Sequence, residues 1–243
     1  MMTEKLYFND SYLKECDGRI NRINDKGIIP DRTVFYPSGG GQPGDSGILT
    51  VNGKEYRVGN TVKEGEEVLL LIDGPFDDLK EGDHFHGTID WDKRYSYMKF
   101  HTSIHLIDGI VNKMPDYEGL ITGSQIYEDR ARVDFSIEDF SQDIAQEIIN
   151  RVNGAIMENH DIRVKYISGE EAVKIPNISR TAPGRELIKN LSIVRIIEIV
   201  GIDEQADGGT HVSNTRELGQ IKLQKIENKG KKNKRLYFTL VPF

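Results

Sequence analysis

His101 and His105, four residues apart, are the residues of this sequence whose types and spacing best suit chemistry. On a helix this spacing puts both imidazoles on one face, near enough to share a metal ion. Two histidines at this spacing are also common as ordinary helix residues, so that alternative stays open. Thr102 stands where a zinc peptidase of this pattern carries its glutamate base, and peptidase activity is therefore not expected.

A second segment, residues 205–212, reads QADGGTHV. It is too rich in glycine for a helix, so the backbone can bend and bring Asp207 and His211 toward one point. A glycine turn with a surface aspartate and histidine is the alternative. Together the two segments offer three histidines and one carboxylate. This donor set suits zinc, with Asp207 either a ligand at about 2.0–2.2 Å or a group that orients a ligand.

A glycine-rich run, residues 36–47, reads YPSGGGQPGDSG and encloses Gln42. It does not fit a phosphate-binding loop, because that motif ends in Gly-Lys-Ser/Thr and opens a helix. A hairpin turn, or a loop pressed against a ligand, remains.

The elements that must position these residues change character near residue 92. Before it, short β-type runs are separated by turn signals, and Asn52-Gly53 is a strong signal for a two-residue hairpin turn. This pattern predicts a small antiparallel barrel or sandwich. The runs are residues 19–23, 27–35, 48–51, 55–58, 67–72 and 84–90.

After residue 92 the pattern is mixed. Residues 136–139 resemble a helix start, and apolar residues then recur every four positions to a helix end near Asn159. A shorter helix is expected from Ser168, strands at 131–135 and 193–200, and a hairpin of 220–226 with 236–241. The class predicted is α+β: an N-terminal β-barrel domain, residues 1–92, and a C-terminal domain, 93–243, with helices packed on an antiparallel sheet.

Composition narrows the function classes. The chain has 243 residues, a net charge of −7 and one cysteine, Cys16, which excludes an internal disulfide and a multi-cysteine metal site. No apolar run approaches the about 20 residues that cross a bilayer, and the N-terminus lacks a secretory apolar stretch. We therefore expect a cytoplasmic protein without membrane or DNA partners, although a local basic face is compatible with the net charge.

Four segments of the sequence, taken together in their order along the chain, resemble one known family. FHTSIHL is followed about a hundred residues later by DGGTHV. Upstream lie FYPSGGGQPGDSG and the spaced residues Asp90, Arg94 and Met98. The sequence resembles the editing module of alanyl-tRNA synthetase and, as a separate chain, the AlaX proteins. The DGGTHV segment resembles the second additional domain shared with threonyl-tRNA synthetase.

The resemblance implies a zinc site built from His101, His105, His211 and position 207. Many members have cysteine there, whereas this chain has Asp207. A harder carboxylate ligand implies weaker zinc binding, tolerance of other metals, or three histidines and a water around the metal. The resemblance also places Gln42 against the aminoacyl group or the terminal adenosine, with Gly40, Gly41, Gly208 and Gly209 as further substrate contacts.

Thr122 matches, by its distance from the first histidine pair, a threonine that contacts the substrate side chain in small members of the family. A pocket in which this threonine hydrogen-bonds the hydroxyl of the substrate side chain would favour serine over alanine. A buried or strand-edge threonine is the alternative. Lysine-rich residues 222–235 are either a tRNA-phosphate contact or a solvated turn. The tRNA-binding residues predicted are Lys222, Lys225, Lys231, Lys232, Lys234 and Arg235, with Arg94 and Lys99 near the first histidine.

The function predicted is ATP-independent, zinc-dependent hydrolysis of the aminoacyl ester of mischarged Ser-tRNA(Ala), with Gly-tRNA(Ala) as a second substrate. The metal would either lower the pKa of a water toward about 7 or position the substrate. Gln42 and Asp207 are the catalytic candidates, Asp207 as a base if it is not a ligand. The alternatives are a catalytically silent tRNA-binding module and a zinc hydrolase of another ester or amide.

Overall fold

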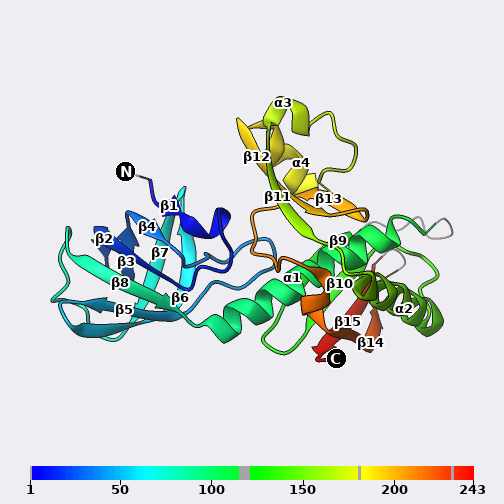
Figure 1. Ribbon diagram of the computed structural model, residues 1–243, viewed down its shortest axis with the longest axis horizontal. Coiled ribbons are helices and arrows are strands. Elements are labelled where there is room, and N and C mark those ends of the chain that lie inside the picture. The colour runs from blue at the N-terminus through cyan, green and yellow to red at the C-terminus, as the bar shows by residue number, and fades with distance from the viewer. Residues whose placement is uncertain (1, 115–120, 180–181, 231–232) are drawn as a thin grey trace. The chain divides into compact units, whose positions relative to one another are not determined.

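The computed structural model describes residues 2–114, 121–179, 182–230 and 233–243. The chain divides into two compact units, Met1–Tyr97 and Met98–Phe243, whose elements are labelled in Figure 1. Helix α1 (Trp91–Val111) begins in the first unit and ends in the second. The assignment of separate functions to residues 1–92 and 93–243 stays a prediction.

The first unit is built around a closed antiparallel barrel, which confirms the predicted N-terminal fold (Figure 1). Side chains along β8 alternate between exposed and buried, as expected when one face of each strand lines the barrel core. A parallel pair, β1 (Glu4–Lys5) with β4 (Arg32–Thr33), and a short helix, η1 (Leu6–Phe8), accompany it. The barrel order is β2 (Glu15–Asn24), β3 (Gly27–Pro30), β7 (Glu67–Asp73), β6 (Lys54–Glu64), β5 (Gly47–Val51) and β8 (His84–Ile89).

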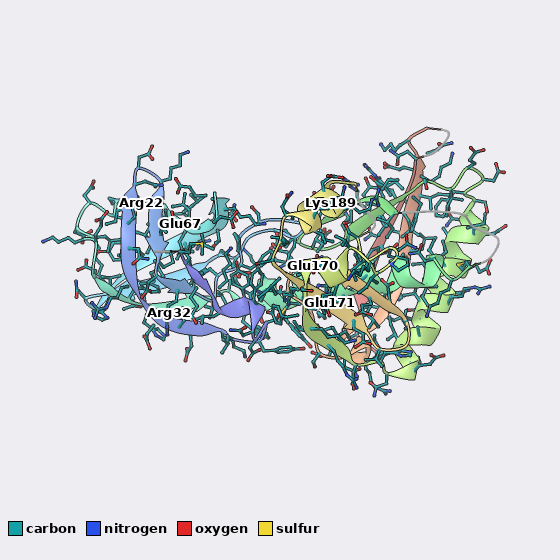
Figure 2. All side chains as sticks on the ribbon, turned by 90° about the horizontal axis from the view of Figure 1, so that it is seen from above. Arg22, Arg32, Glu67, Glu170, Glu171 and Lys189 are labelled. Atoms are coloured by element: carbon teal, nitrogen blue, oxygen red, sulfur yellow. The ribbon has the colours of Figure 1, made fainter. Side chains whose placement is uncertain are left out.

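The predicted hairpin at Asn52-Gly53 is confirmed. It joins β5 to β6, and both residues have positive φ, 50° and 79°, the conformation that a two-residue turn of this kind requires. On the barrel surface Arg22 of β2 pairs with Glu67 of β7 at 2.8 Å, and Figure 2 shows the two side chains together.

The second unit has two antiparallel sheets where the sequence predicted one. A four-stranded sheet has the order β14 (Gln220–Asn228), β15 (Lys234–Val241), β10 (Ala131–Phe135), β9 (Ile121–Ile126). A three-stranded sheet has the order β11 (Ile162–Ser168), β12 (Ile193–Ile199), β13 (Asp203–Ala206). The α+β class and the hairpin β14–β15 are confirmed. Among the described residues no helix is long and apolar enough to cross a membrane.

Helix α2 (Gln142–Glu158) starts later than predicted. Its N-cap is Ser141, whose hydroxyl accepts a hydrogen bond from Ile144 N, and its C-cap Asn159 has φ 65°. The predicted start at Ser136 is wrong because Ser141, which lies nearer to the buried apolar residues of the helix, supplies the capping oxygen. The end near Asn159 is confirmed. Asn153 anchors the helix to β14 through two 2.9 Å bonds with the backbone of Ile221.

A small layer of helices covers one face of the three-stranded sheet. The predicted start at Ser168 is confirmed: its hydroxyl accepts from Glu171 N, and the Glu171 side chain accepts from Ser168 N, which caps α3 (Gly169–Ala172). Figure 2 labels Glu171 at this helix. Helix α4 (Ala182–Lys189) completes the layer, and η2 (Thr215–Leu218) follows residues 205–212 along the chain. The buried apolar cluster formed by this layer and the sheet consists of Ala172, Ile178, Ile188, Val194 and Ile196.

Candidate metal centre

The C-terminal half of α1 carries the first pair of ligand candidates. His101 and His105 lie one turn apart and are both buried, with ring centroids 5.1 Å from each other. A 3.6-residue repeat brings positions four apart onto the same helix face. The helix therefore fixes the separation of the two imidazoles before any ligand arrives.

The second pair follows β13, where the chain leaves the sheet. Asp207 N donates to Arg195 O at 3.2 Å, which extends the pairing of β13 with β12 by one residue. The Arg195 guanidinium donates to Asp207 O at 3.0 Å and to Gly209 O at 2.8 Å. These bonds hold the backbone on both sides of Gly208 and so set the direction of the Asp207 side chain.

Position 209 requires glycine because its backbone lies very close to the His101 ring. A β-carbon there would lie 2.1 Å from Cε1 and 2.3 Å from Nδ1 of His101, inside van der Waals contact. The backbone of Gly209 thus packs directly on the His101 ring. Gly208 is exposed and Gly209 buried, and their role as substrate contacts stays a prediction.

The two segments bring His101, His105, Asp207 and His211 together, with their ligand atoms all within 4.8 Å of one another. Asp207 Oδ1 is 3.6 Å from His101 Nε2 and 3.8 Å from His105 Nε2, and Asp207 Oδ2 is 3.1 Å from His211 Nε2. Ligand bonds of about 2.0–2.1 Å in a tetrahedron separate neighbouring ligand atoms by about 3.3–3.4 Å. Donor type and spacing therefore fit a divalent metal such as zinc.

The pKa directions at the cluster favour a neutral imidazole at two of its three histidines, His101 and His211. Burial lowers the pKa of His101 to about 4 and, with the charge of His101, lowers the pKa of His211 well below its usual range. Burial also lowers the pKa of His105, but the hydrogen bond and charge of Asp207 outweigh it and raise the value above normal. Burial alone would raise the pKa of Asp207, yet the histidines hold it well below its usual range. Metal ligands need an ionised carboxylate and imidazoles with a free lone pair, which is the state favoured at Asp207, His101 and His211. A metal bound by His105, in contrast, would displace a proton from its ring.

The glycine-rich run of the first unit is a hairpin turn. Gly39 and Gln42 exchange two backbone bonds of 3.0 Å each, and the residues between them, Gly40 and Gly41, have φ 60° and 85°. The Gln42 side chain is not solvated, since the residue is 2% exposed. Its predicted contact with substrate, and that of Gly40 and Gly41, stays a prediction.

Arg94 is buried in the first unit and has a structural role. Its guanidinium is fully buried and forms an ion pair with Asp45, while also donating to the carbonyl oxygens of Ser11 and Val34. Asp45 in turn accepts from Tyr36 N at 2.6 Å. The buried position leaves Arg94 no surface on which to meet a phosphate. We therefore assign it to the core of the first unit instead of to the predicted tRNA contact.

The other predicted contacts are scattered. Thr122 is exposed on the edge strand β9, and its hydroxyl donates to Asp134 O at 3.3 Å. Lys222 and Lys225 are exposed on β14, and Lys99 is half-buried on α1. Lys234 Nζ donates to Asn228 Oδ1 at 2.9 Å and Gly230 O at 3.0 Å, and Arg235 pairs with Asp134. Lys234 therefore stabilises the β14–β15 hairpin, and Arg235 links β15 to β10. Lys231 and Lys232 lie outside the described residues.

Two residues of the centre were missed by sequence reasoning. Arg195 is the one charge among apolar residues 193–197, IVRII, and a buried charge in an apolar strand is a signal that could have found it. Thr102 is recognisable in the sequence only as the residue that replaces a glutamate. Its hydroxyl lies 3.1 Å from His211 Nδ1 and accepts from Val212 N at 3.2 Å. No sequence signal links residues 109 positions apart.

Comparisons with known proteins assign this chain to a family. The threonyl and alanyl tRNA synthetase second additional domain matches residues 194–237, and the class II (A) tRNA synthetases match residues 7–93. The alanyl-tRNA editing protein AlaX-M of Saccharolobus solfataricus is 44% identical over 99% of this chain and 100% of its own. The AlaX-M protein of Methanosarcina acetivorans is 41% identical with the same coverage. The alanine–tRNA ligase of Thermococcus kodakarensis is 34% identical over 93% of this chain and 24% of its own. Identity of this extent shows that the chain belongs to the AlaX family of alanyl-tRNA editing proteins.

Proposed function

We propose that this protein is a trans-editing hydrolase that removes a wrong amino acid from tRNA(Ala), with Ser-tRNA(Ala) as substrate and Gly-tRNA(Ala) as a second one. Relatives of full length are named alanyl-tRNA editing proteins, which supports tRNA(Ala) as the partner. In the reaction a water oxygen attacks the ester carbonyl carbon and the bond from that carbon to the ribose oxygen breaks. The ribose oxygen takes up a proton, which leaves free serine and intact tRNA.

The observation that carries this proposal is the cluster of three buried imidazoles and one partly buried carboxylate on two segments of the second unit. When bound there, a divalent metal such as Zn²⁺ would supply Lewis-acid chemistry for ester hydrolysis. His101, His105 and His211 would hold it through Nε2, the atoms that face Asp207. The pKa directions at the site keep Asp207 ionised at neutral pH.

Asp207 has two roles open to it in this proposal. As a ligand it would complete four-fold coordination with the histidines. As a base it would accept a proton from the attacking water. Its Oδ2 also accepts a hydrogen bond from Gly209 N, which fixes one oxygen and leaves Oδ1, 3.6 Å and 3.8 Å from the two α1 histidines, facing them. A fixed carboxylate of this kind supports the ligand role, which we propose.

For the tRNA we propose contacts at the exposed lysines of β14, Lys222 and Lys225. Lys225 pairs with Glu227 at 2.5 Å, and an exposed pair of this kind is weak enough for a phosphate to displace it. Such contacts would add affinity that falls with salt and carries no sequence information. A loss of affinity in Lys222→Ala that shrinks at high salt is the expected result, and an unchanged salt slope would contradict it.

The test of the function is hydrolysis of Ser-tRNA(Ala) and Ala-tRNA(Ala) by the purified protein, with its metal content measured on the same sample. We expect rapid loss of serine but not alanine, and no loss after treatment with a zinc chelator. Restoring Zn²⁺ should restore activity. His160→Ala is a matched control for the ligand histidines, because His160 bonds Val200 O and Glu158 and lies outside the cluster.

The possible outcomes separate the alternatives. Hydrolysis of neither ester by metal-loaded protein would reject the substrate and favour a hydrolase of another ester or amide. Tight tRNA binding without metal and without hydrolysis would identify a silent binding module. Hydrolysis that survives complete removal of metal would reject the metal dependence while leaving the editing function intact.

A further inference from the structure

Thr102 lies between the two segments that form the metal centre. It follows His101 on α1, is fully buried, and faces the other segment through its hydroxyl. Its Oγ1 accepts a hydrogen bond from Val212 N at 3.2 Å and lies 3.1 Å from His211 Nδ1. One oxygen therefore connects the helix that carries two ligand candidates to the ring of a third.

The hydroxyl contacts the ring nitrogen that points away from the cluster. His211 Nε2 faces Asp207 at 3.1 Å, so Nδ1 is the nitrogen left to fix the rotation of the imidazole. Metal-ligating histidines commonly use this second nitrogen to bond an acceptor, which sets the tautomer and the ring plane. Thr102 occupies that place for His211.

A hydroxyl can serve both tautomers of the ring. Without metal, His211 Nε2–H can donate to Asp207, and the Thr102 O–H then donates to Nδ1. If Nε2 held a metal, the ring proton would sit on Nδ1, and Thr102 Oγ1 would accept it with its second lone pair while still accepting from Val212 N. A hydroxyl has one donor and two acceptor positions, whereas an ionised carboxylate could only accept. The ring can therefore exchange its tautomer without moving.

We propose that Thr102 is a positioning residue for His211 that holds its ring in one place with and without metal. The proposal rests on the metal-dependent function proposed above, but it predicts a property of the metal site that is measured without tRNA. It assigns the hydroxyl, and not the methyl group or the helix position, as the group that matters.

The test compares Zn²⁺ affinity in four proteins by competition with a chromophoric chelator. Thr102→Val keeps the shape and removes the hydroxyl, and Thr102→Ala does so with a better helix former. Thr102→Ser keeps the hydroxyl. Ser103→Ala is the control, because Ser103 is the next residue, is fully buried, and donates to Lys99 O at 2.8 Å without a bond to a ligand candidate.

We expect Zn²⁺ affinity to fall about 10- to 100-fold in Thr102→Val and Thr102→Ala, the usual loss for a removed partner of a metal-ligating histidine. Thr102→Ser should keep the wild-type affinity, and Ser103→Ala should change it less than about 3-fold. In the zinc-loaded protein the Nδ1–H signal of His211, followed in a ¹⁵N-histidine NMR spectrum, should be protected from exchange. That protection should be lost in Thr102→Val and kept in Thr102→Ser.

The measured Zn²⁺ affinities decide whether the Thr102 hydroxyl positions His211. Equal affinity in all folded variants, or loss in Thr102→Ser as well, would overturn the role of the hydroxyl while leaving the editing function untouched. If Thr102→Val does not fold, Thr102→Ala and the serine rescue still give the answer. Wild-type protein that binds Zn²⁺ but leaves Ser-tRNA(Ala) intact would reject the editing function and not this inference. Wild-type protein that binds no metal would reject both.

Discussion

Asp45 in the first unit and Asp207 in the second are both carboxylates enclosed by nitrogen atoms, yet the groups around them differ in whether they can bind a cation. Asp45 is held by the buried guanidinium of Arg94 and by Tyr36 N. Asp207 is surrounded by three imidazoles and bonded by Gly209 N. A guanidinium has five donors and no lone pair, whereas a neutral imidazole offers one. The first cluster is therefore closed on itself, and the second can take up a cation.

The difference shows that burial and charge do not by themselves mark a functional site. Each carboxylate has one neighbouring glycine in the sequence, and the sequence alone predicts Arg94 on a tRNA-binding surface. What separates the two clusters is whether the partner nitrogens hold permanent protons. The comparison predicts that changes at the second cluster affect activity, while changes at the first affect stability.

The largest effect is expected for His105→Ala. Loss of one ligand should lower the rate of Ser-tRNA(Ala) hydrolysis by more than the about 10- to 100-fold that is typical when only a hydrogen-bond partner of a metal ligand is removed. The free energy of unfolding of the metal-free protein should change little by comparison. Single-turnover deacylation and denaturant unfolding measure the two quantities. A large loss of stability with activity per folded molecule retained would remove the contrast between the clusters.

Arg94→Ala should have the opposite profile. It leaves Asp45 buried without its cation, which typically costs about 3–5 kcal/mol. Denaturant unfolding should show this loss of stability, while the Zn²⁺ content of the folded fraction stays the same. Lys54→Ala, at the exposed pair with Asp78, is the control and should leave stability unchanged. A stable Arg94→Ala protein would show that the first cluster is not what holds its unit together.

Asp207→Cys sharpens the account of the second cluster. A thiolate is a softer ligand than a carboxylate and suits zinc better. We expect about a 10-fold or greater gain in Zn²⁺ affinity and a smaller response to Mg²⁺ or Mn²⁺, measured by competition with a chelator. Asp45→Cys should bring no gain. Unchanged zinc affinity in Asp207→Cys would mean that position 207 is not a ligand and would favour its role as a base.

The smallest effect is expected at Asp134, a carboxylate clamped by Arg132 and Arg235 on the four-stranded sheet. Burial raises the pKa of Asp134, but the two arginines outweigh it and lower the pKa below 3.8. A lowered folded-state pKa gives stability that is present above about pH 4 and is lost as pH falls through the folded value. Wild type should therefore exceed Asp134→Asn in stability at pH 6 and converge with it toward pH 2. Parallel curves would contradict the shifted pKa.

The sequence predicted the parts of this molecule that depend on local spacing. Short β-type runs separated by turn signals, Asn52-Gly53 among them, predicted the barrel, and residues 168–171 predicted the helix cap at Ser168. The histidine pair of α1 was found because one helical turn fixes its geometry. Contacts between distant segments were not predictable in the same way. Arg195 bonding the Asp207 backbone, Thr102 meeting His211, and the division of the second unit into two sheets depend on tertiary packing, which no local pattern records.

The contact between Gly209 and the His101 ring has a consequence for protein engineering. Because Gly209 does not have a positive φ, its backbone shape alone would accept alanine, and a library screened only for foldable backbones would keep such variants. The 2.1 Å approach to His101 means that each of them must rotate the imidazole off its axis. Redesign of the metal preference therefore has freedom at position 207 but none two residues later, where a hydrogen atom is the largest side chain that leaves the ring in place.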